Sequence, residues 1–403
     1  MQQTNIALDQ DKLNVTAKSR SNIFNWRGQF TPQFIDYLLS TFSREGNIVI
    51  DPFSGSGTVL HECARWNLSC YGFEINPAAY AMSKFFTLAN KPVEERKTLI
   101  SALEDAVFSV LDPYYGMPLF QDSRNYRKKY HNLIEFSKNL FSIIDDRTQR
   151  LIAINMLFIA ESRKNGNLSS AITNAYEYIK RKILELSFSE SPIFVHLCDS
   201  RATHKKIQNY ADLLITSPPY INVFNYHQNY RAILELLGWD LLKVAQSEIG
   251  SNRKNRGNRF RTMVQYCLEI EESLKSLWHS LRNDAVLVFV VGRESKVRGI
   301  PFYNGMIIKE IMRGMGSFEN ITNYERHFIN RFGIKIKEDI IFARRRASSP
   351  SNSIAREISL KHLKKAGLRA KDDVKKDIEE TIDQINGIEC SQILNGKEVF
   401  KNV

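Results

Sequence analysis

Apolar residues recur along the chain with two different periods, and these periods separate strands from helices. Short apolar runs have the length and composition of buried strands at 47–50, 70–73, 193–197, 213–215 and 285–291. Apolar residues three or four positions apart predict helices between these runs. The first helix is expected after Thr31-Pro32, a helix cap followed by proline at the first helical position. This alternation of strands and helices predicts a parallel sheet.

The stretch from 91 to 190 departs from the alternation. Helical spacing continues there without any strand pattern, over 99–111, 130–144, 149–162 and 171–186. We therefore expect a helical insertion, after which the sheet resumes. Two later runs, 318–326 and 339–343, predict an antiparallel pair at the sheet edge. The predicted fold class is α/β: a Rossmann-like, mostly parallel seven-stranded sheet with an antiparallel edge hairpin and a helical insertion.

Three parts follow from these patterns. Residues 1–90 and 191–349 form the expected α/β domain, residues 91–190 the helical insertion, and residues 350–403 a charged tail. The polar first 20 residues are expected to be mobile. The charge run at 361–376 predicts a solvated helix.

Composition narrows the class of protein. The chain has 403 residues and a net charge of +12, which favours an anionic partner such as nucleic acid. None of its five cysteines forms a CxxC pair, so we expect neither a zinc site nor a disulfide scaffold. The polar N-terminus does not resemble a signal peptide, and no apolar run is long enough to span a bilayer. These features predict a cytoplasmic protein.

A glycine-rich turn follows the first strand. It reads Asp51-Pro52-Phe53-Ser54-Gly55-Ser56-Gly57-Thr58 and leads into a helix whose first N–H groups are free to bind a ligand. Glu74 ends the next strand, where an acidic residue commonly accepts the ribose hydroxyls of a nucleotide-like cofactor. The full dinucleotide fingerprint and the Gly-Lys-Ser/Thr of triphosphate sites are both missing. A ribose-bearing zwitterion fits best, and S-adenosylmethionine is such a molecule.

A second turn, Thr216-Ser217-Pro218-Pro219-Tyr220, ends the strand at 213–215. Two adjacent prolines cannot continue a strand, because neither donates a backbone N–H. Ligands of open parallel sheets lie at the carboxyl ends of strands. Asp51, Glu74, Asp199 and Ser217 all lie at predicted carboxyl ends, so we expect them to form one site.

The two turns together resemble the amino-methyltransferases of DNA, which methylate exocyclic amines of cytosine or adenine. The resemblance covers about 26–90 and 193–343. It implies direct methyl transfer from S-adenosylmethionine to a base flipped out of double-stranded DNA, and the serine of the second turn is typical of the cytosine-N4 branch. The catalytic residues that it implies are Ser217, Pro218, Pro219 and Tyr220. The cofactor-binding residues that it implies are Phe30, Thr31, Asp51, Pro52, Phe53, Gly55, Gly57, Thr58, Glu74 and Asp199.

The second turn suits this chemistry. An exocyclic amine is a poor nucleophile, because its lone pair is delocalised into the ring. The Ser217 hydroxyl and the Pro218 carbonyl could accept hydrogen bonds from its two N–H groups and aim the lone pair at the methyl group. Tyr220 could stack on the flipped base. A carbon-5 enzyme would need a cysteine after a proline, and no cysteine here follows one. No metal is required.

Several alternatives stay open. Asp199 could contact the adenine amine of the cofactor or only cap a helix, and Phe224 and Tyr226 could be base contacts or groove packing. The helical insertion, the segment 240–262 with its basic loop 251–261, or the basic clusters at 127–129 and 180–182 could contact DNA. Adenine-N6 methylation of DNA, guanine-N2 methylation of RNA and a non-catalytic binding module are the other functions considered. A cognate restriction endonuclease is a possible partner, and the sequence leaves the oligomeric state open.

Overall fold

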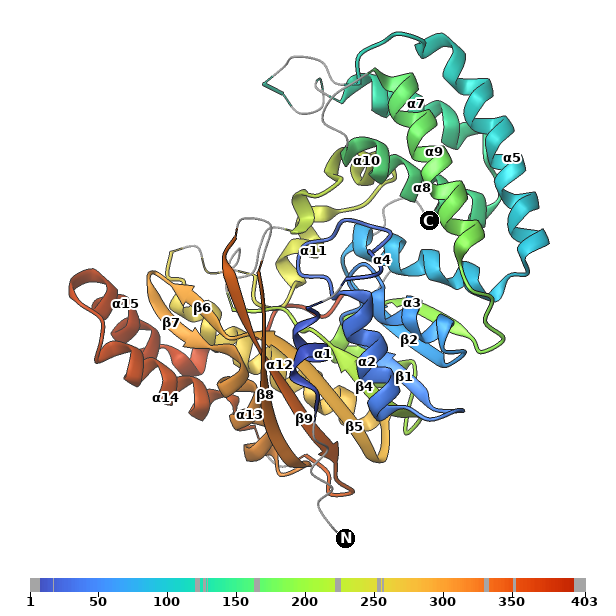
Figure 1. Cartoon of the computed structure of the whole chain (residues 1–403). Coiled ribbons are helices and arrows are strands. Elements are labelled where there is room, and N and C mark those ends of the chain that lie inside the picture. The colour runs from blue at the N-terminus through green and yellow to red at the C-terminus, as the bar shows by residue number, and fades with distance from the viewer. Residues whose placement is uncertain are drawn as a thin grey trace.

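The computed structural model describes residues 8–16, 18–119, 124–125, 128, 130–162, 167–221, 226–251, 255, 257–329, 333–350 and 353–394. Its centre is a seven-stranded sheet in the order β3-β2-β1-β4-β5-β9-β8 (Figure 1). The strands are β1 (Ile48–Asp51), β2 (Ser69–Glu74), β3 (Ile193–Leu197), β4 (Ala211–Thr216), β5 (Leu281–Gly292), β8 (Phe318–Ile329) and β9 (Lys335–Arg345).

The first five strands of this sheet pair in parallel, and β9 pairs antiparallel with both β5 and β8. The order turns at β1, because β2 and β4 lie on its two sides. Ligands of such sheets bind outside the carboxyl ends of the strands near this turning point. The predicted fold class is confirmed, including the antiparallel hairpin at the edge.

Side chains of the central strands alternate between two apolar cores. Val49 of β1 packs into one core, whereas Ile48 and Ile50 pack into the other. In β5, Val288 and Val290 face the first core, and their neighbours face the second. Because both faces are covered, these strands are apolar at nearly every position, and this is the pattern that identified them in the sequence.

Helices cover both faces of the sheet (Figure 1). The first core contains α2 (Pro32–Phe42), α3 (Thr58–Arg65) and α4 (Pro77–Lys84). The second core contains α12 (Phe260–Ser280), α13 (Asn304–Met315), α14 (Ala355–Gly367) and α15 (Asp372–Asp383).

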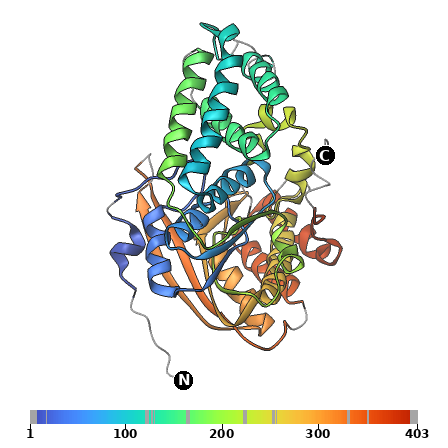
Figure 2. The same cartoon turned by 90° about the vertical axis from the view of Figure 1, so that its right-hand side faces the viewer.

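The insertion forms a helical block that stands beyond the sheet (Figure 2). It comprises α5 (Val93–Leu111), α7 (His131–Ile143), α8 (Arg147–Ser162) and α9 (Leu168–Glu185). Its apolar residues continue the first core, and the buried Asn155 side chain of α8 donates to the Ala81 carbonyl of α4 at 2.9 Å. Helix α10 (Arg231–Leu236) joins the block as well, because Tyr230 before it stacks on Phe158 at 4.3 Å between ring centroids. The division of the chain into domains remains a prediction.

The expectation of a mobile N-terminus is wrong for the residues that the structure describes. Residues 10–14 form the short helix α1 (Gln10–Asn14), and its Leu13 is fully buried. The side chain of Gln10 donates to the Glu325 carbonyl, and Asn14 accepts from the His327 N–H. These two amides satisfy backbone groups of the edge strand β8 that would otherwise be free to pair with another strand.

The expectation of a single solvated helix in the tail is also wrong. Two helices, α14 and α15, meet at 368–371, and Leu363, Ala366 and Ile378 are buried in the second core. The charge run hid the apolar spacing of the inner face. The hairpin of β6 (Glu294–Val297) and β7 (Ile300–Tyr303) and the helix α11 (Leu241–Ser247) were not predicted either. In the described part of the chain, no helix is long and apolar enough to cross a membrane.

Gly57 gives the fold a sharp test. Its φ is +86°, and a Cβ there would lie 2.7 Å from the Phe86 ring and 2.8 Å from the Ser83 Cα. We expect Gly57→Ala to lower the free energy of unfolding by about 3 kcal/mol, from the left-handed backbone and the overpacking together. Denaturant unfolding measures this change.

Gly46→Ala is the matched control, because Gly46 has φ of +79° and nothing within 4 Å of an added Cβ. Gly46→Ala should lower the free energy of unfolding by about 1 kcal/mol, the cost of the left-handed backbone alone. Equal losses in the two variants would show that the close approach of α4 and the following turn to Gly57 does not matter.

Candidate active site

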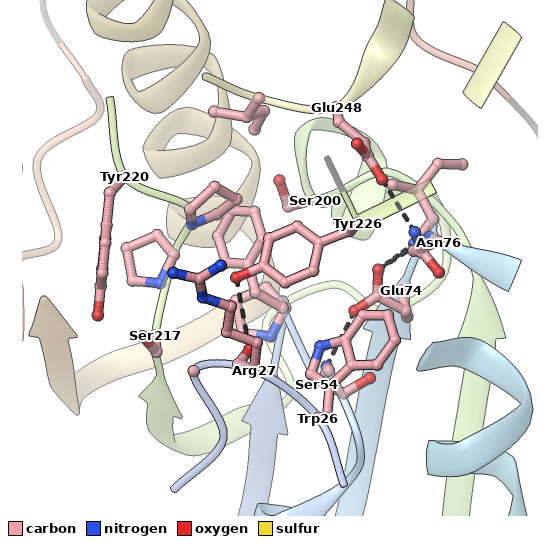
Figure 3. A pocket seen from close by; sticks show the side chains of 18 of the residues that line it. Trp26, Arg27, Ser54, Glu74, Asn76, Ser200, Ser217, Tyr220, Tyr226 and Glu248 are labelled. Carbon is pink, nitrogen blue, oxygen red and sulfur yellow. Dashed lines mark hydrogen bonds between the residues drawn. The ribbon is translucent and has the colours of Figure 1, made fainter. Parts of the chain in front are cut away.

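A cavity of about 380 Å³ opens at the carboxyl ends of β1, β2, β3 and β4. Figure 3 shows its two sides: Ser217 and Tyr220 lie on one, Glu74 and Asn76 on the other, and Trp26 and Tyr226 lie between them. The described lining therefore comes from eight separate parts of the chain: 26–30, 51–56 with Thr58, 74–76, 198–200, 217–221, Tyr226, 247–249 with Ser251, and 294–296.

Asp51 is a buried carboxyl, only 2% exposed, at the end of β1. Its Oδ1 accepts a 2.6 Å hydrogen bond from the Thr216 hydroxyl and a 3.2 Å bond from the Phe53 N–H. Burial raises the pKa of Asp51 to about 7, although these two donors oppose the rise, and the nearby Glu74 adds to it. Asp51 can therefore change its charge near neutral pH.

Glu74 ends β2 and faces the glycine-rich turn. Its Oε2 accepts from the Gly55 N–H at 2.9 Å, and its Oε1 accepts from the N–H groups of Ile75 and Asn76, both at 2.9 Å. Burial raises the pKa of Glu74, and the backbone donors oppose that rise. The carboxylate is thus fixed in position, and Oε2, which accepts one of these bonds, keeps acceptor capacity for a ligand hydroxyl.

The glycine-rich turn holds its shape through contacts with the segment before α2. Gly55 has φ of +52°, and a Cβ there would lie 3.6 Å from the Trp26 ring. The Ser56 hydroxyl donates to the Gln29 side chain at 2.8 Å, and the Thr58 hydroxyl donates to Asn22 at 3.1 Å. The segment 22–30 therefore covers the turn, and Trp26 closes the cavity above Gly55.

Trp26 is one half of an aromatic pair across the cavity. It stacks on Tyr226 with ring centroids 5.4 Å apart and an interplanar angle of 17°, and the Tyr226 hydroxyl donates to the Arg27 carbonyl at 3.4 Å. This pair brings the chain after the second turn against the chain before the first turn. Of the two predicted residues here, Phe30 lines the cavity, whereas Thr31 stands at the N-cap position of α2, makes no side-chain capping hydrogen bond there and is not among the lining residues.

Asp199 follows β3 and lines the cavity next to Ser200. It caps the 3-10 helix Ser200–Lys205 by accepting from the Arg201 N–H at 2.9 Å. The Arg201 guanidinium also grips it, at 3.0 Å to Oδ1 and 2.6 Å to Oδ2. The capping alternative considered for Asp199 is therefore present in the structure, and the carboxylate borders the cavity as well.

The second turn, 217–220, lines the opposite side of the cavity. The Tyr220 ring lies against Gly292 at the end of β5, where a Cβ would come within 2.8 Å of it. Burial raises the pKa of Tyr220, and hydrogen bonds with the Ser217 side chain and the Gly292 backbone oppose the rise. The turn is thus held in two ways, by the rigidity of its two prolines and by the contact of the Tyr220 ring with Gly292 of β5.

Asn304, fully buried at the start of α13, ties this region together. Its Oδ1 accepts from the Ile221 N–H at 3.3 Å, and its Nδ2 donates to the Gly292 carbonyl at 2.8 Å. The same amide contacts the hydroxyl of Ser295 in the β6–β7 hairpin, at 3.0 Å from Nδ2. Glu294, Ser295 and Lys296 of that hairpin line the cavity beside the second turn.

Most of the predicted site residues meet at this cavity. The lining includes Phe30, Asp51, Pro52, Phe53, Gly55, Thr58, Glu74, Asp199, Ser217, Pro218, Pro219 and Tyr220. Gly57 is not among the lining residues, because it faces Phe86 and lets α3 begin there. The roles assigned to these residues remain predictions.

The sequence reasoning missed several lining residues, among them Asn76, Ser200, Glu248 and Lys296. Asn76 caps α4 through its Oδ1 and donates from Nδ2 to Glu248 at 3.0 Å. Its position two residues after Glu74 was a usable signal. Glu248 and Lys296 gave none, because only the fold brings their segments to the cavity.

The candidate DNA contacts fare differently. Lys180 pairs with Glu104, and Arg181 and Lys182 pair with Glu185, so this cluster is largely neutralised within the insertion. Phe224, Arg127, Lys129 and most of the basic side chains of 251–261 lie outside the described residues. Arg261, at the start of α12, contacts Glu380 and Gln384 at the end of α15.

Comparisons with known proteins agree with this geometry. Residues 7–85 match the family described as DNA methylase, N6_N4_Mtase. Type II methyltransferase M.MjaII from Methanocaldococcus jannaschii is 40% identical over 55 residues, which are 14% of this chain and 10% of that protein. Type II methyltransferase M.AvaI from Nostoc sp. is 23% identical over 324 residues, 66% of this chain and 64% of that protein. The chain spans less than two thirds of the length of these curated relatives.

Among solved structures, TrmN from Thermus thermophilus aligns with 79% of this chain and 50% of its own, at 12% identity and a TM-score of 0.33. That score is too low to support a conclusion. The family match includes the glycine-rich turn and Glu74, and the name of the family covers both N6 and N4 methylases. The matches confirm the resemblance predicted from the sequence: the chain is similar to the DNA amino-methyltransferases, and this similarity supports S-adenosylmethionine as the cofactor.

Proposed function

We propose that the protein is a site-specific DNA methyltransferase that transfers a methyl group from S-adenosylmethionine to the N4 amine of cytosine. The observation that carries the proposal is the meeting of two turns at one cavity: the lining combines Asp51, Gly55 and Glu74 with Ser217–Tyr220. A methyl donor held by the first turn would face an acceptor held by the second. The match to the DNA methylase family and the +12 net charge support a nucleic-acid substrate.

The first turn suits the donor. Glu74 presents a fixed carboxylate to ribose hydroxyls, Asp199 borders the cavity where an adenine amine would lie, and Trp26 covers the turn at Gly55. Asp51 adds a carboxyl that ionises near neutral pH, which suits a cation. When bound, S-adenosylmethionine supplies an electrophilic methyl group on a sulfonium.

The second turn suits the acceptor. The Ser217 hydroxyl and the Pro218 carbonyl accept hydrogen bonds from the two N–H groups of the amine. These bonds aim the nitrogen lone pair across the cavity, toward the methyl donor. The prolines and the seat of Tyr220 on Gly292 keep these acceptors from moving, so the geometry is set before the substrate binds. Reaching this turn requires the base to leave the duplex, and Tyr220 lines the place where the flipped base would lie.

The biological setting that we propose is a restriction-modification or host-marking system, with double-stranded DNA as substrate and a cognate restriction endonuclease as a possible partner. Two relatives carry the printed name Type II methyltransferase. We further propose the insertion, 91–190, as the region that reads the DNA sequence. It packs on the segment after the second turn through Phe158 and Tyr230. The segment 240–262, with its basic loop 251–261, is the rival.

The alternative that the observations favour next is adenine-N6 methylation of DNA. The matched family covers both bases, and only Ser217 argues for cytosine. Guanine-N2 methylation of RNA is a third candidate.

Nucleoside mass spectrometry tests the proposal directly. Plasmid DNA and tRNA are incubated with the protein and S-adenosylmethionine carrying a labelled methyl group, and the nucleosides are then analysed. We expect labelled N4-methylcytosine in DNA and a loss of at least about 100-fold in rate with Ser217→Ala, since a positioned acceptor is removed. N6-methyladenine would overturn the base assignment, and label in tRNA alone would overturn the DNA substrate.

Asp51 predicts a pH dependence of cofactor binding. Its carboxyl is neutral below its pKa of about 7, and a cationic ligand favours the ionised form. The dissociation constant of S-adenosylmethionine should therefore rise about tenfold per pH unit as the pH falls below 7, and should level off above it. Calorimetric titrations from pH 5.5 to 8.5 measure this dependence.

Two variants serve as controls for that titration. Asp51→Asn should bind the cofactor more weakly at pH 8 and with little pH dependence. Thr216→Val removes a donor that lowers the pKa of Asp51, so the midpoint should move to higher pH. A midpoint that stays in place in both variants would assign the titration to another group.

A further inference from the structure

A buried polar network lies behind Asp199, on the side away from the cavity. At its centre is Arg201, whose side chain is fully buried and holds both carboxylate oxygens of Asp199. The direction in which Asp199 presents its carboxylate to the cavity is therefore set by where the Arg201 guanidinium lies.

The other donors of Arg201 reach residues from the far end of the chain. Its Nη1 donates to the Ser391 carbonyl at 2.8 Å, and its Nη2 approaches the Gln392 carbonyl at 3.4 Å. We call residues 388–394 the C-terminal strap. Every third residue of the strap is buried: Ile388, Ser391 and Leu394. Leu394 packs with Val244, Ile75 and Leu197, beside the cavity and next to β3.

Ser391 completes the coordination of a second buried carboxylate. Its N–H and its hydroxyl both donate to Glu269 Oε1 of α12, at 2.8 and 2.6 Å. Glu269 is fully buried and lies 3.7 Å from Arg201 Nη1. Without the strap, Glu269 would lose two donors and Arg201 two acceptors. Burying a charge without partners is costly, so the strap and the Arg201 side chain must be ordered together.

The strap also supports the cavity wall at a second point. The Ser391 hydroxyl lies 3.2 Å from the Ser247 carbonyl, and Arg201 Nη2 lies 3.4 Å from the same oxygen. Ser247 lines the cavity, and Glu248 after it holds Asn76. The strap thus contacts two separate parts of the lining from outside, Asp199 through Arg201 and Ser247 directly.

We propose that the C-terminal strap is part of the cofactor site. Arg201 and Ser391 are positioning residues, which place Asp199 and the wall at 247–251 for the ligand. Docking of the strap and binding of S-adenosylmethionine therefore strengthen each other. This inference rests on the proposed function only in taking the cavity as the cofactor site, and it holds whichever base is methylated.

The first test compares two serines with the same chemistry. Ser391→Ala in the full chain should raise the dissociation constant of S-adenosylmethionine by about tenfold, because a hydrogen bond to a buried carboxylate is lost. Ser353→Ala is the matched control: the Ser353 hydroxyl donates to Glu271, also on α12, outside the network around Arg201. The control should leave the dissociation constant unchanged, and thermal unfolding should show both variants folded.

The second test uses the reciprocity of coupled binding. If strap docking favours the cofactor, saturating S-adenosylmethionine must slow hydrogen exchange of the Ser391 amide in the wild-type protein. In Ser391→Ala, the amide at 391 should exchange faster than in wild type without the cofactor. A structural role alone would leave exchange in the strap unaffected by the cofactor.

The outcomes separate this inference from the proposed function. Failure of the wild-type protein to bind S-adenosylmethionine would overturn both. Binding with equal dissociation constants in wild type and Ser391→Ala, and with no slowing of exchange at 388–394, would overturn the strap alone. Methylation of adenine in place of cytosine would leave it standing.

Discussion

The hydrogen bond from the Thr216 hydroxyl to Asp51 is the contact on which the site depends, because it joins the ends of two adjacent parallel strands. Thr216 is the last residue of β4 and Asp51 the last of β1, so the bond fixes where both following turns begin. The turn after β1 leads to Gly55, whose N–H donates to Glu74 of β2. The turn after β4 leads to Tyr220, whose ring contacts Gly292 of β5. A shift of one strand by a single residue would separate the two turns and point their side chains to the wrong faces of the sheet.

The sequence predicted what local patterning determines. Strands buried on both faces are apolar throughout, so β1, β4 and β5 could be recognised in the sequence. The turns after β1 and β4 could be recognised as well, because they contain Gly55 and Pro218, which end regular strands. Since carboxyl ends of parallel strands share one edge, the meeting of Asp51, Glu74, Asp199 and Ser217 at one cavity could be expected. What failed was the reading of charged segments. Lys and Arg in the tail lie on the outer faces of α14 and α15, and they masked the apolar inner face that holds Leu363 and Ile378.

Contacts between distant segments that do not follow from the shared edge of the parallel strands could not be predicted. Ser391 lies 192 positions after Asp199, yet one arginine separates them in space. Asn304, the first residue of α13, reaches back to Ile221 and Gly292 in the same way. Serine and asparagine are common at turns and helix ends, so neither residue signals a role beside the cavity. Such residues matter because a buried amide or carboxylate must find all its partners, and those partners come from whichever segments the fold brings near.

Asp51, Glu74 and Asp199 line the cavity and are stabilised in different ways, and the difference bears on the ligand. Asp199 is paired with a cation, Arg201. In the part of the chain that the structure describes, the hydrogen bonds to Asp51 and Glu74 come from neutral donors: a hydroxyl and backbone N–H groups. Burial raises the pKa of both carboxyls, and the nearby Glu74 adds to the rise at Asp51. A ligand that brings positive charge between them removes this penalty, whereas a neutral or anionic ligand of the same shape does not. The end of the cavity formed by β1 and β2 is therefore suited to a sulfonium or an ammonium group. Asp199, already neutralised, is suited to the hydrogen-bond donors of an uncharged ring.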